Sequence, residues 1–222
     1  MEVILLHGAL GSSFSMQPLS HLLKDSFDVF TMNFRGHGVE SDATAFTMKD
    51  LAKDIAALIH REGLQRPAIM GYSMGGYAAL QLAAQSPGVA GSIMTLGTKF
   101  AWSPEFAKSE SKMLDPDLIR EKVPALADVL WERHGNKWEQ LCLATAEMMK
   151  QLGAGPEIEF ARIESPVLIT RGELDKMVTR EESEGAADKL GNGRFYEFPN
   201  MPHQLEKANL QEVANRFKAF VM

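Results

Sequence analysis

The stretch Gly71-Tyr72-Ser73-Met74-Gly75-Gly76 decides the fold of this chain. An apolar run, residues 67–70, precedes it, and a helix-like run rich in Ala and Leu follows over residues 77–84. A strand, a sharp turn with a serine at its tip and a helix together predict a nucleophile elbow. Gly71 and Gly75 suit so tight a turn, because a Cβ two positions before or after the serine would collide with neighbouring backbone. The positive end of the helix dipole would face the serine hydroxyl.

Six short apolar segments predict a sheet around this elbow. The segments that we expect to be strands are residues 3–6, 27–34, 67–70, 89–96, 166–170 and 194–198. Helical patterns separate most of them, such as the run from an expected N-cap at Thr47 to about Arg61, which carries one apolar stripe. This alternation favours the α/β class, with a mostly parallel six-stranded sheet and helices on both faces.

The alternation of strands and helices stops between about residues 98 and 163. The helical runs that we expect there cover residues 103–113, 116–122, 124–134 and 136–152, followed by a Gly-rich linker at residues 153–156. The sequence therefore predicts one domain, residues 1–222, with an all-helical insertion after the fourth strand.

Composition argues against several classes of protein. The net charge is −6 and no Lys/Arg cluster occurs, which argues against nucleic acid or an anionic membrane as the main partner. No apolar run approaches the roughly 20 residues that a membrane span needs. The first residues lack a basic segment and a small-residue cleavage site, so we expect no signal peptide. The single cysteine, Cys142, fits a reducing compartment, and we expect a cytoplasmic protein.

Three polar side chains follow the ends of separate predicted strands. Ser73 follows the third strand, Asp175 the fifth and His203 the sixth, and ligands bind at this edge of parallel sheets. Ser, then Asp, then His is the chain order of the catalytic triad on such a sheet. The serine needs a base, the histidine suits that task, and the carboxylate orients the imidazole. We expect no metal or cofactor, because neither a metal-ligand spacing nor a dinucleotide fingerprint is present.

Other residues compete for these roles. Glu173 lies two residues before Asp175, but strand alternation favours Asp175. We expect His21 and His60 to be solvated, His134 to end a helix, and His7 and His37 to tie neighbouring loops together. Arg35 either binds a substrate carboxylate or forms a structural ion pair, and the ion pair is favoured.

Acyl transfer also requires an oxyanion hole. One donor should be the backbone N–H of Met74, the residue after the nucleophile. The other should come from the glycine-rich loop after the first strand, where the N–H of Ala9 is within reach.

Five motifs together resemble the α/β-hydrolase superfamily, in particular its lipases and esterases. They are His7-Gly8-Ala9-Leu10-Gly11-Ser12, Phe34-Arg35-Gly36-His37-Gly38, Gly71-Tyr72-Ser73-Met74-Gly75-Gly76, Gly172-Glu173-Leu174-Asp175 and His203. The resemblance implies that the helical insertion is a cap that shapes the substrate pocket. Leu10, Tyr72, Trp102, Trp131 and Trp138 are then expected to contact the substrate.

The sequence departs from the pattern of this family in four places. It starts at the family's third strand, so we expect the N-terminal β-hairpin to be absent. Asn33 replaces an Asp, and Glu40-Ser41 lengthens the loop after Gly38 by one residue. Met201-Pro202 replaces the small residue and glycine that usually precede the histidine.

The expected activity is hydrolysis of a carboxylic ester or thioester of a small to medium apolar acyl group, through an acyl-enzyme. The expected partner is this small-molecule substrate, and the protein would be a monomer or a homodimer. The resemblance leaves open a C–C bond hydrolase, a lyase or a perhydrolase on the same triad. It also leaves open a receptor of the same fold that does not catalyse a reaction.

Overall fold

The computed structural model describes residues 1–39, 45–155 and 158–222. The longer loop expected at Glu40-Ser41 and Pro156 of the expected linker lie outside the described residues. No helix in the described ranges is long and apolar enough to cross a membrane.

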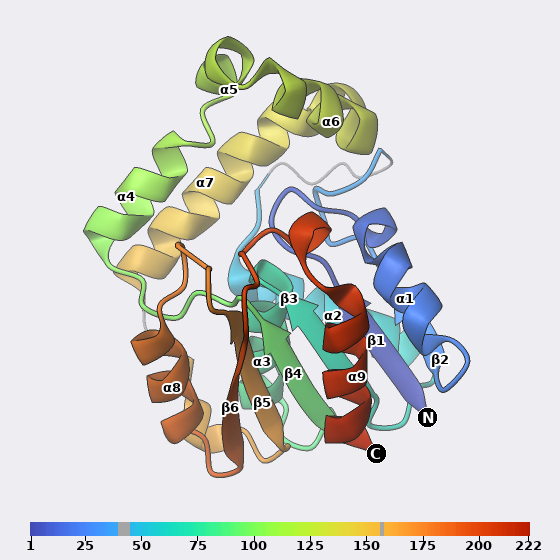
Figure 1. Ribbon diagram of the computed structural model, residues 1–222. Coiled ribbons are helices and arrows are strands. Elements are labelled where there is room, and N and C mark those ends of the chain that lie inside the picture. The colour runs from blue at the N-terminus through green and yellow to red at the C-terminus, as the bar shows by residue number, and fades with distance from the viewer. Residues whose placement is uncertain (40–44, 156–157) are drawn as a thin grey trace.

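The centre of the fold is a six-stranded parallel sheet (Figure 1). Its strands are β1 (Glu2–Leu6), β2 (Asp28–Thr31), β3 (Ala68–Tyr72), β4 (Ser92–Leu96), β5 (Val167–Gly172) and β6 (Gly193–Phe198). They lie in the order β2-β1-β3-β4-β5-β6, and every neighbouring pair is parallel. The predicted α/β sheet is therefore confirmed. The edge strand β2 is shorter than expected, because its pairing with β1 begins at Asp28 and ends at Thr31.

Helices cover both faces of the sheet. One face carries α1 (Gln17–Leu23) and α9 (Leu210–Val221), and the other carries α2 (Met48–Arg61), α3 (Met74–Gln85) and α8 (Arg180–Asp188). Alternate side chains of β1 point to opposite faces of the sheet. Val3 and Leu5 pack with α1 and α9, whereas Ile4 and Leu6 pack with α2 and α3. The sheet is therefore buried on both sides, as its continuous apolar strands indicate.

The N-terminus of α2 follows the sequence prediction. Thr47 Oγ1 accepts the backbone N–H of Asp50 at 3.2 Å, and the Asp50 carboxylate accepts the backbone N–H of Thr47 at 3.1 Å. This capping box satisfies two N–H groups that the helix itself leaves unpaired.

Four helices stand between β4 and β5 and lie over the carboxyl ends of the strands (Figure 1). They are α4 (Pro104–Lys112), α5 (Pro116–Lys122), α6 (Pro124–His134) and α7 (Trp138–Ala154). We call this group the cap. The first two residues of the expected linker, Gly153 and Ala154, belong to α7, which begins and ends two residues later than predicted. Short 3-10 turns occur at Ser13–Met16, Gly135–Lys137, Phe160–Arg162 and Leu205–Lys207.

Candidate active site

The elbow between β3 and α3 holds Ser73 in a strained conformation. Its φ of 50° and ψ of −116° are uncommon for any residue other than glycine. The glycines leave no room for side chains: a Cβ on Gly71 would lie 2.4 Å from the backbone nitrogen of Gly76. A Cβ on Gly75 would lie 2.7 Å from the carbonyl oxygen of His7. The elbow is therefore packed directly against the loop that follows β1.

Asp175 and His203 form a hydrogen-bonded pair after β5 and β6. The Nδ1–H of His203 donates to Asp175 Oδ2 over 2.7 Å. Asp175 Oδ1 accepts the backbone N–H groups of Met177 at 2.8 Å and Val178 at 2.9 Å, so the carboxylate is held in place. An ionised carboxylate only accepts hydrogen bonds, so Nδ1 of His203 carries the proton and Nε2 is left as an acceptor.

The carboxylate of Asp175 is buried but remains ionised. Burial by itself would raise the pKa of Asp175, but the hydrogen bond and charge of His203, with the two backbone donors, outweigh it and hold the pKa below its usual 3.8. The Asp175 side chain is fully buried, whereas that of His203 keeps 17% of its surface exposed. The imidazole is therefore the accessible member of the pair.

The end of β4 brings Ser73 and this pair together. The backbone N–H of Ser73 donates to the carbonyl oxygen of Leu96 at 2.8 Å. The next residue, Gly97, has a φ of 62°, and a Cβ there would lie 3.3 Å from both Asp175 Oδ2 and His203 Nδ1. Gly97 thus lets the Asp–His pair pack against the end of β4 beside the elbow.

The unusual lead-in to His203 is tied to the strand ends. The carbonyl oxygen of Met201 accepts the backbone N–H of Leu174 at 2.9 Å, and the Met201 side chain is buried. The hydroxyl of Tyr72 donates to the carbonyl oxygen of His203 at 3.0 Å. With Met201-Pro202 in place of the family's smaller residues, the loop still presents His203 to Asp175.

The loop after β1 forms a tight turn beside the elbow. The N–H of Gly11 donates to the carbonyl oxygen of Gly8 at 3.1 Å, and Leu10 in this turn has a φ of 56°. No hydrogen bond of the Ala9 N–H is found within the described part of the chain. Met74 is the first residue of α3, where N–H groups have no partner inside the helix. Both expected oxyanion donors thus come from backbone that is available to a ligand.

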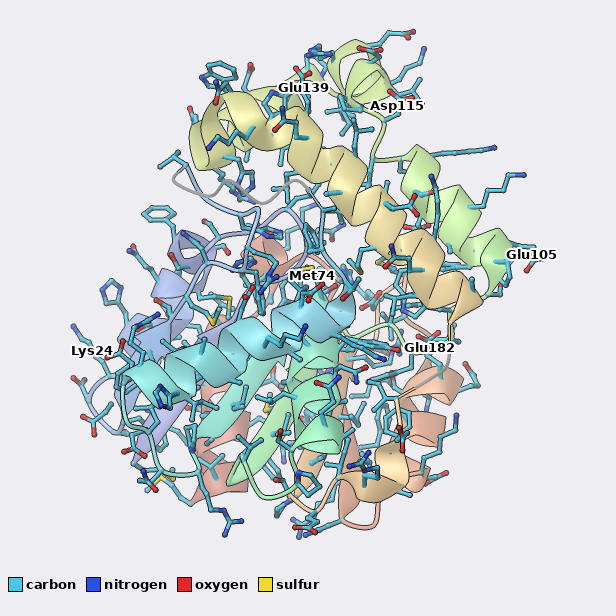
Figure 2. All side chains as sticks on the ribbon, turned by 180° about the vertical axis from the view of Figure 1, so that it is seen from behind. Lys24, Met74, Glu105, Asp115, Glu139 and Glu182 are labelled. Carbon is cyan, nitrogen blue, oxygen red and sulfur yellow. The ribbon has the colours of Figure 1, made fainter. Side chains whose placement is uncertain are left out.

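A cavity of about 30 Å³ adjoins Ser73 and both of these residues. Its lining is largely apolar and rich in methionine, and it consists of Ala9, Met48, Ser73, Met74, Tyr77, Lys99, Trp102, Met148, Met149, Leu152 and Met177. Three of these residues belong to α7 of the cap. Figure 2 labels Met74, which lies below the cap on the side of the sheet that α2 and α3 cover.

The residues expected to contact substrate lie in different places. Trp102 lines the cavity at Ser73. Trp131 is 56% exposed, and Trp138 is buried inside the cap with Leu130. The structure therefore does not bring Trp131 or Trp138 to this cavity. Tyr72 supports the backbone of His203, and Leu10 packs against the cap and the core.

A family model described as the alpha/beta hydrolase fold matches residues 3–137. The chain belongs to this family. The matched region contains three of the five motifs that carry the resemblance: the loop after β1, residues 34–38 and the elbow.

Relatives of this alpha/beta hydrolase include proteins of several named activities. The 2-(acetamidomethylene)succinate hydrolase of Mesorhizobium japonicum is 24% identical over 200 residues, which cover 80% of this chain and 72% of that protein. The sn-1-specific diacylglycerol lipase ABHD11 of Xenopus laevis is 30% identical over 87 residues, which cover 38% of this chain and 28% of that protein.

Solved structures share the fold of this hydrolase. A thermophilic esterase from Thermogutta terrifontis has a TM-score of 0.82 at 20% identity, over 100% of this chain and 89% of that one. NosK from Streptomyces actuosus has a TM-score of 0.83 at 22% identity, over 99% and 96%. At these identities the likeness establishes the fold alone.

The competing polar residues of this hydrolase have other partners. Glu173 accepts the backbone N–H of Asn200 at 2.8 Å. Arg35 donates to both oxygens of the Asp54 carboxylate, as expected for a structural ion pair. His7 Nε2 accepts the backbone N–H of Phe34 at 3.2 Å, so this ring does tie two loops together. His21 and His60 are exposed.

Lys99 in the cavity wall forms an ion pair that was not predicted from the sequence. Lys99 Nζ lies 2.5 Å from Glu182 Oε2, and both side chains are almost completely buried. Lys99 follows the end of β4, the sheet edge where ligands bind, and this position is a signal that could have found it. Within the described residues, no group of His, Cys, Asp and Glu could hold a metal ion.

Proposed function

We propose that this alpha/beta hydrolase is a serine hydrolase of carboxylic esters or thioesters. The observation that carries the proposal is the 2.7 Å hydrogen bond between His203 and Asp175 at the strand ends beside Ser73. This bond orients the imidazole so that its Nε2 can serve as a base for the serine hydroxyl.

The proposed reaction has two stages. Ser73 Oγ attacks the carbonyl carbon of the substrate while His203 Nε2 takes the hydroxyl proton. The N–H groups of Ala9 and Met74 bind the oxyanion. The carbon–oxygen or carbon–sulfur bond then breaks, the leaving alcohol or thiol takes the proton from His203, and an acyl-enzyme remains. A water gives a proton to His203 as its oxygen attacks the acyl-enzyme carbonyl, and His203 then returns this proton to Ser73 Oγ as the bond to the serine breaks and the acid is released.

The size and the lining of the cavity support an apolar acyl group at the small end of the proposed range. Its volume of about 30 Å³ is small, and the methionines Met148 and Met149 of α7 supply an adaptable apolar wall. Larger hollows of about 140, 340 and 620 Å³ lie elsewhere, and Ser73 lines none of them. We therefore expect acetyl and butyryl esters to react faster than esters of long fatty acids.

The charge of the cavity supports a neutral acyl group. Lys99 lies in the wall, but Glu182 neutralises its charge at 2.5 Å. A carboxylate substrate, such as the name of the Mesorhizobium relative suggests, would meet no uncompensated cation there. A comparison of p-nitrophenyl butyrate with p-nitrophenyl hemisuccinate, which is similar in length but charged, tests this preference. Faster Ser73-dependent hydrolysis of the hemisuccinate, after subtraction of its spontaneous cyclisation, would contradict it.

Turnover by Ser73→Ala tests the proposal itself. We expect hydrolysis of p-nitrophenyl acetate and butyrate to fall by about 10³ or more, since the nucleophile is lost. The melting temperature should change little, because the hydroxyl lies beside a cavity. Turnover near the wild-type rate by the folded variant would refute the proposal, and an inactive but ligand-binding wild type would favour a receptor.

A further inference from the structure

The turn that carries Ala9 is held from outside by the cap. The carbonyl oxygen of Leu10 accepts a hydrogen bond from Nε2–H of His134 at 3.0 Å and another from Nη1–H of Arg133 at 3.4 Å. Both donors are at the C-terminal end of α6. The two cap residues therefore contact the backbone one residue beyond the expected oxyanion donor.

This turn needs such support, because its backbone is strained. Leu10 has a φ of 56°, in the left-handed region that a branched side chain rarely adopts. Residues in that region persist only where their surroundings determine the conformation. The hydrogen bonds to the Leu10 carbonyl fix the orientation of its peptide group and, through it, the turn that contains the Ala9 N–H.

The ring of His134 is itself fixed by two loops. Its Nδ1 accepts the backbone N–H of Gly38 at 2.9 Å, while Nε2–H donates to Leu10. Both bonds together require the neutral ring with its proton on Nε2. The ring is completely buried, and burial lowers the pKa of His134, so this neutral form is the one the fold keeps.

We propose that His134 is a positioning residue. It links the position of the cap to the geometry of the oxyanion hole. It touches no reacting atom, and it acts by holding Leu10 so that the Ala9 N–H faces the substrate oxygen. The proposal rests on the proposed function, since it requires that Ala9 binds an oxyanion. A purely structural histidine would stabilise the cap without changing the turnover of folded molecules.

Two substitutions separate the two hydrogen bonds of this ring. His134→Gln puts an amide N–H near the position of Nε2 and can keep the bond to Leu10. His134→Asn puts an amide oxygen near the position of Nδ1 and can keep the bond to Gly38, but it does not reach Leu10. The two variants remove the same ring, so they form a matched pair.

We expect the pair to differ in kcat and not in KM. Loss of an oxyanion donor costs about 10²–10³ in kcat, so its displacement in His134→Asn should cost roughly tenfold or more with p-nitrophenyl butyrate. KM should stay within about twofold, and His134→Gln should keep kcat within about threefold of wild type. Equal kcat values in the two variants, or a loss confined to the melting temperature, would overturn the proposal.

Ile119→Ala is the control for the stability of the cap. Ile119 is buried in α5 within the cap cluster, and its truncation should lower the melting temperature and leave kcat unchanged. A fall in kcat as large as that of His134→Asn would assign the effect to cap stability and overturn the proposal.

Should neither variant at position 134 fold, Arg133→Met removes the other donor to Leu10. The Arg133 side chain is 28% exposed and also pairs with Glu206, so Glu206→Gln controls for the loss of the ion pair. We expect kcat to fall about two- to fivefold in Arg133→Met and to stay unchanged in Glu206→Gln. Equal kcat values in these two variants would overturn the proposal.

A fluorophosphonate probe distinguishes the two failures. Labelling of Ser73 in the wild type, with equal rates in the two variants at position 134, defeats the positioning role alone. Absence of labelling and of hydrolysis in the folded wild type defeats both the proposed function and the positioning role.

Discussion

Two groups of histidine lie near the carboxyl edge of this sheet, and they differ in their partners. His203 donates to a carboxylate and remains partly exposed. His7, His37 and His134 are buried, and their rings lie 4.8 Å and 5.8 Å apart, measured between the centroids of His7 and His37 and of His37 and His134. A carboxylate partner prepares a histidine to accept a proton, whereas burial among backbone groups keeps a histidine neutral. The surroundings, and not the residue type, separate a base from a packing group.

Hydrogen bonds and burial keep the buried histidines in the neutral form. His7 Nδ1–H donates to the carbonyl oxygen of Gly8 at 2.8 Å, and Nε2 accepts the N–H of Phe34. A proton on Nε2 would set two N–H groups against each other. Burial lowers the pKa of His7 to about 4 and holds that of His37 well below its usual 6.5.

The largest expected effect comes from replacing Asp175, the carboxylate partner of His203. Asp175→Asn keeps an oxygen that accepts the N–H groups of Met177 and Val178, but it places an amide N–H group where the oxygen that accepts Nδ1–H of His203 was. We expect kcat to fall by about 10⁴, because the imidazole would adopt the wrong tautomer. Hydrolysis of p-nitrophenyl acetate measures it. Glu173→Gln is the control and should stay near wild type, and equal losses in the two variants would contradict the assignment of Asp175.

The next effect tests the buried group through pH. The folded state keeps His7 neutral down to about pH 4, whereas the unfolded chain takes up a proton below about 6.5. The unfolded state therefore binds more protons in this window, and stability falls as the pH drops from 6.5 to 4, by about 3 kcal/mol from His7. Urea unfolding at a series of pH values measures this loss.

Two variants assign the pH dependence to its source. His7→Gln should reduce the dependence, although His37 and His134 will retain a part of it. His21→Gln, at an exposed position, should leave the dependence as in wild type. A dependence that is unchanged in His7→Gln would show that another group causes it.

The smallest expected effect is a change in KM, which compares a tryptophan in the cavity wall with one on the cap surface. Trp102 lines the cavity, whereas Trp131 is exposed on the cap. Trp102→Ala should raise KM for p-nitrophenyl butyrate by roughly three- to tenfold, since about 0.7–1.4 kcal/mol of apolar contact is lost. Trp131→Ala should change KM by less than about twofold. A larger change in Trp131→Ala would place the substrate on the outer face of the cap.

The sequence predicts the sheet and the spacing of the polar residues because their requirements are local. The turn at Ser73 needs Gly71 whatever surrounds it, because a Cβ there would collide with the backbone of Gly75 and Gly76 in the same turn. Strand ends of a parallel sheet meet at one edge, so Asp175 and His203 could be expected to lie together.

The inner face of the cap could not be predicted in the same way. Leu130 is fully buried and its neighbour Trp131 is mostly exposed, because successive helical residues point in directions about 100° apart. The pattern of α6 does not say which of its apolar residues is buried inside the cap. Lys99 and Glu182 are 83 residues apart in the sequence, so no local pattern predicts that they form an ion pair.

The most direct test of the central claim is to map the covalent adduct of a fluorophosphonate by peptide mass spectrometry. The account predicts one adduct, on Ser73, which is absent in Ser73→Ala and forms much more slowly in Asp175→Asn. An adduct on another residue, or an unchanged rate in folded Asp175→Asn, would contradict the assignment of Ser73, His203 and Asp175 as one catalytic unit.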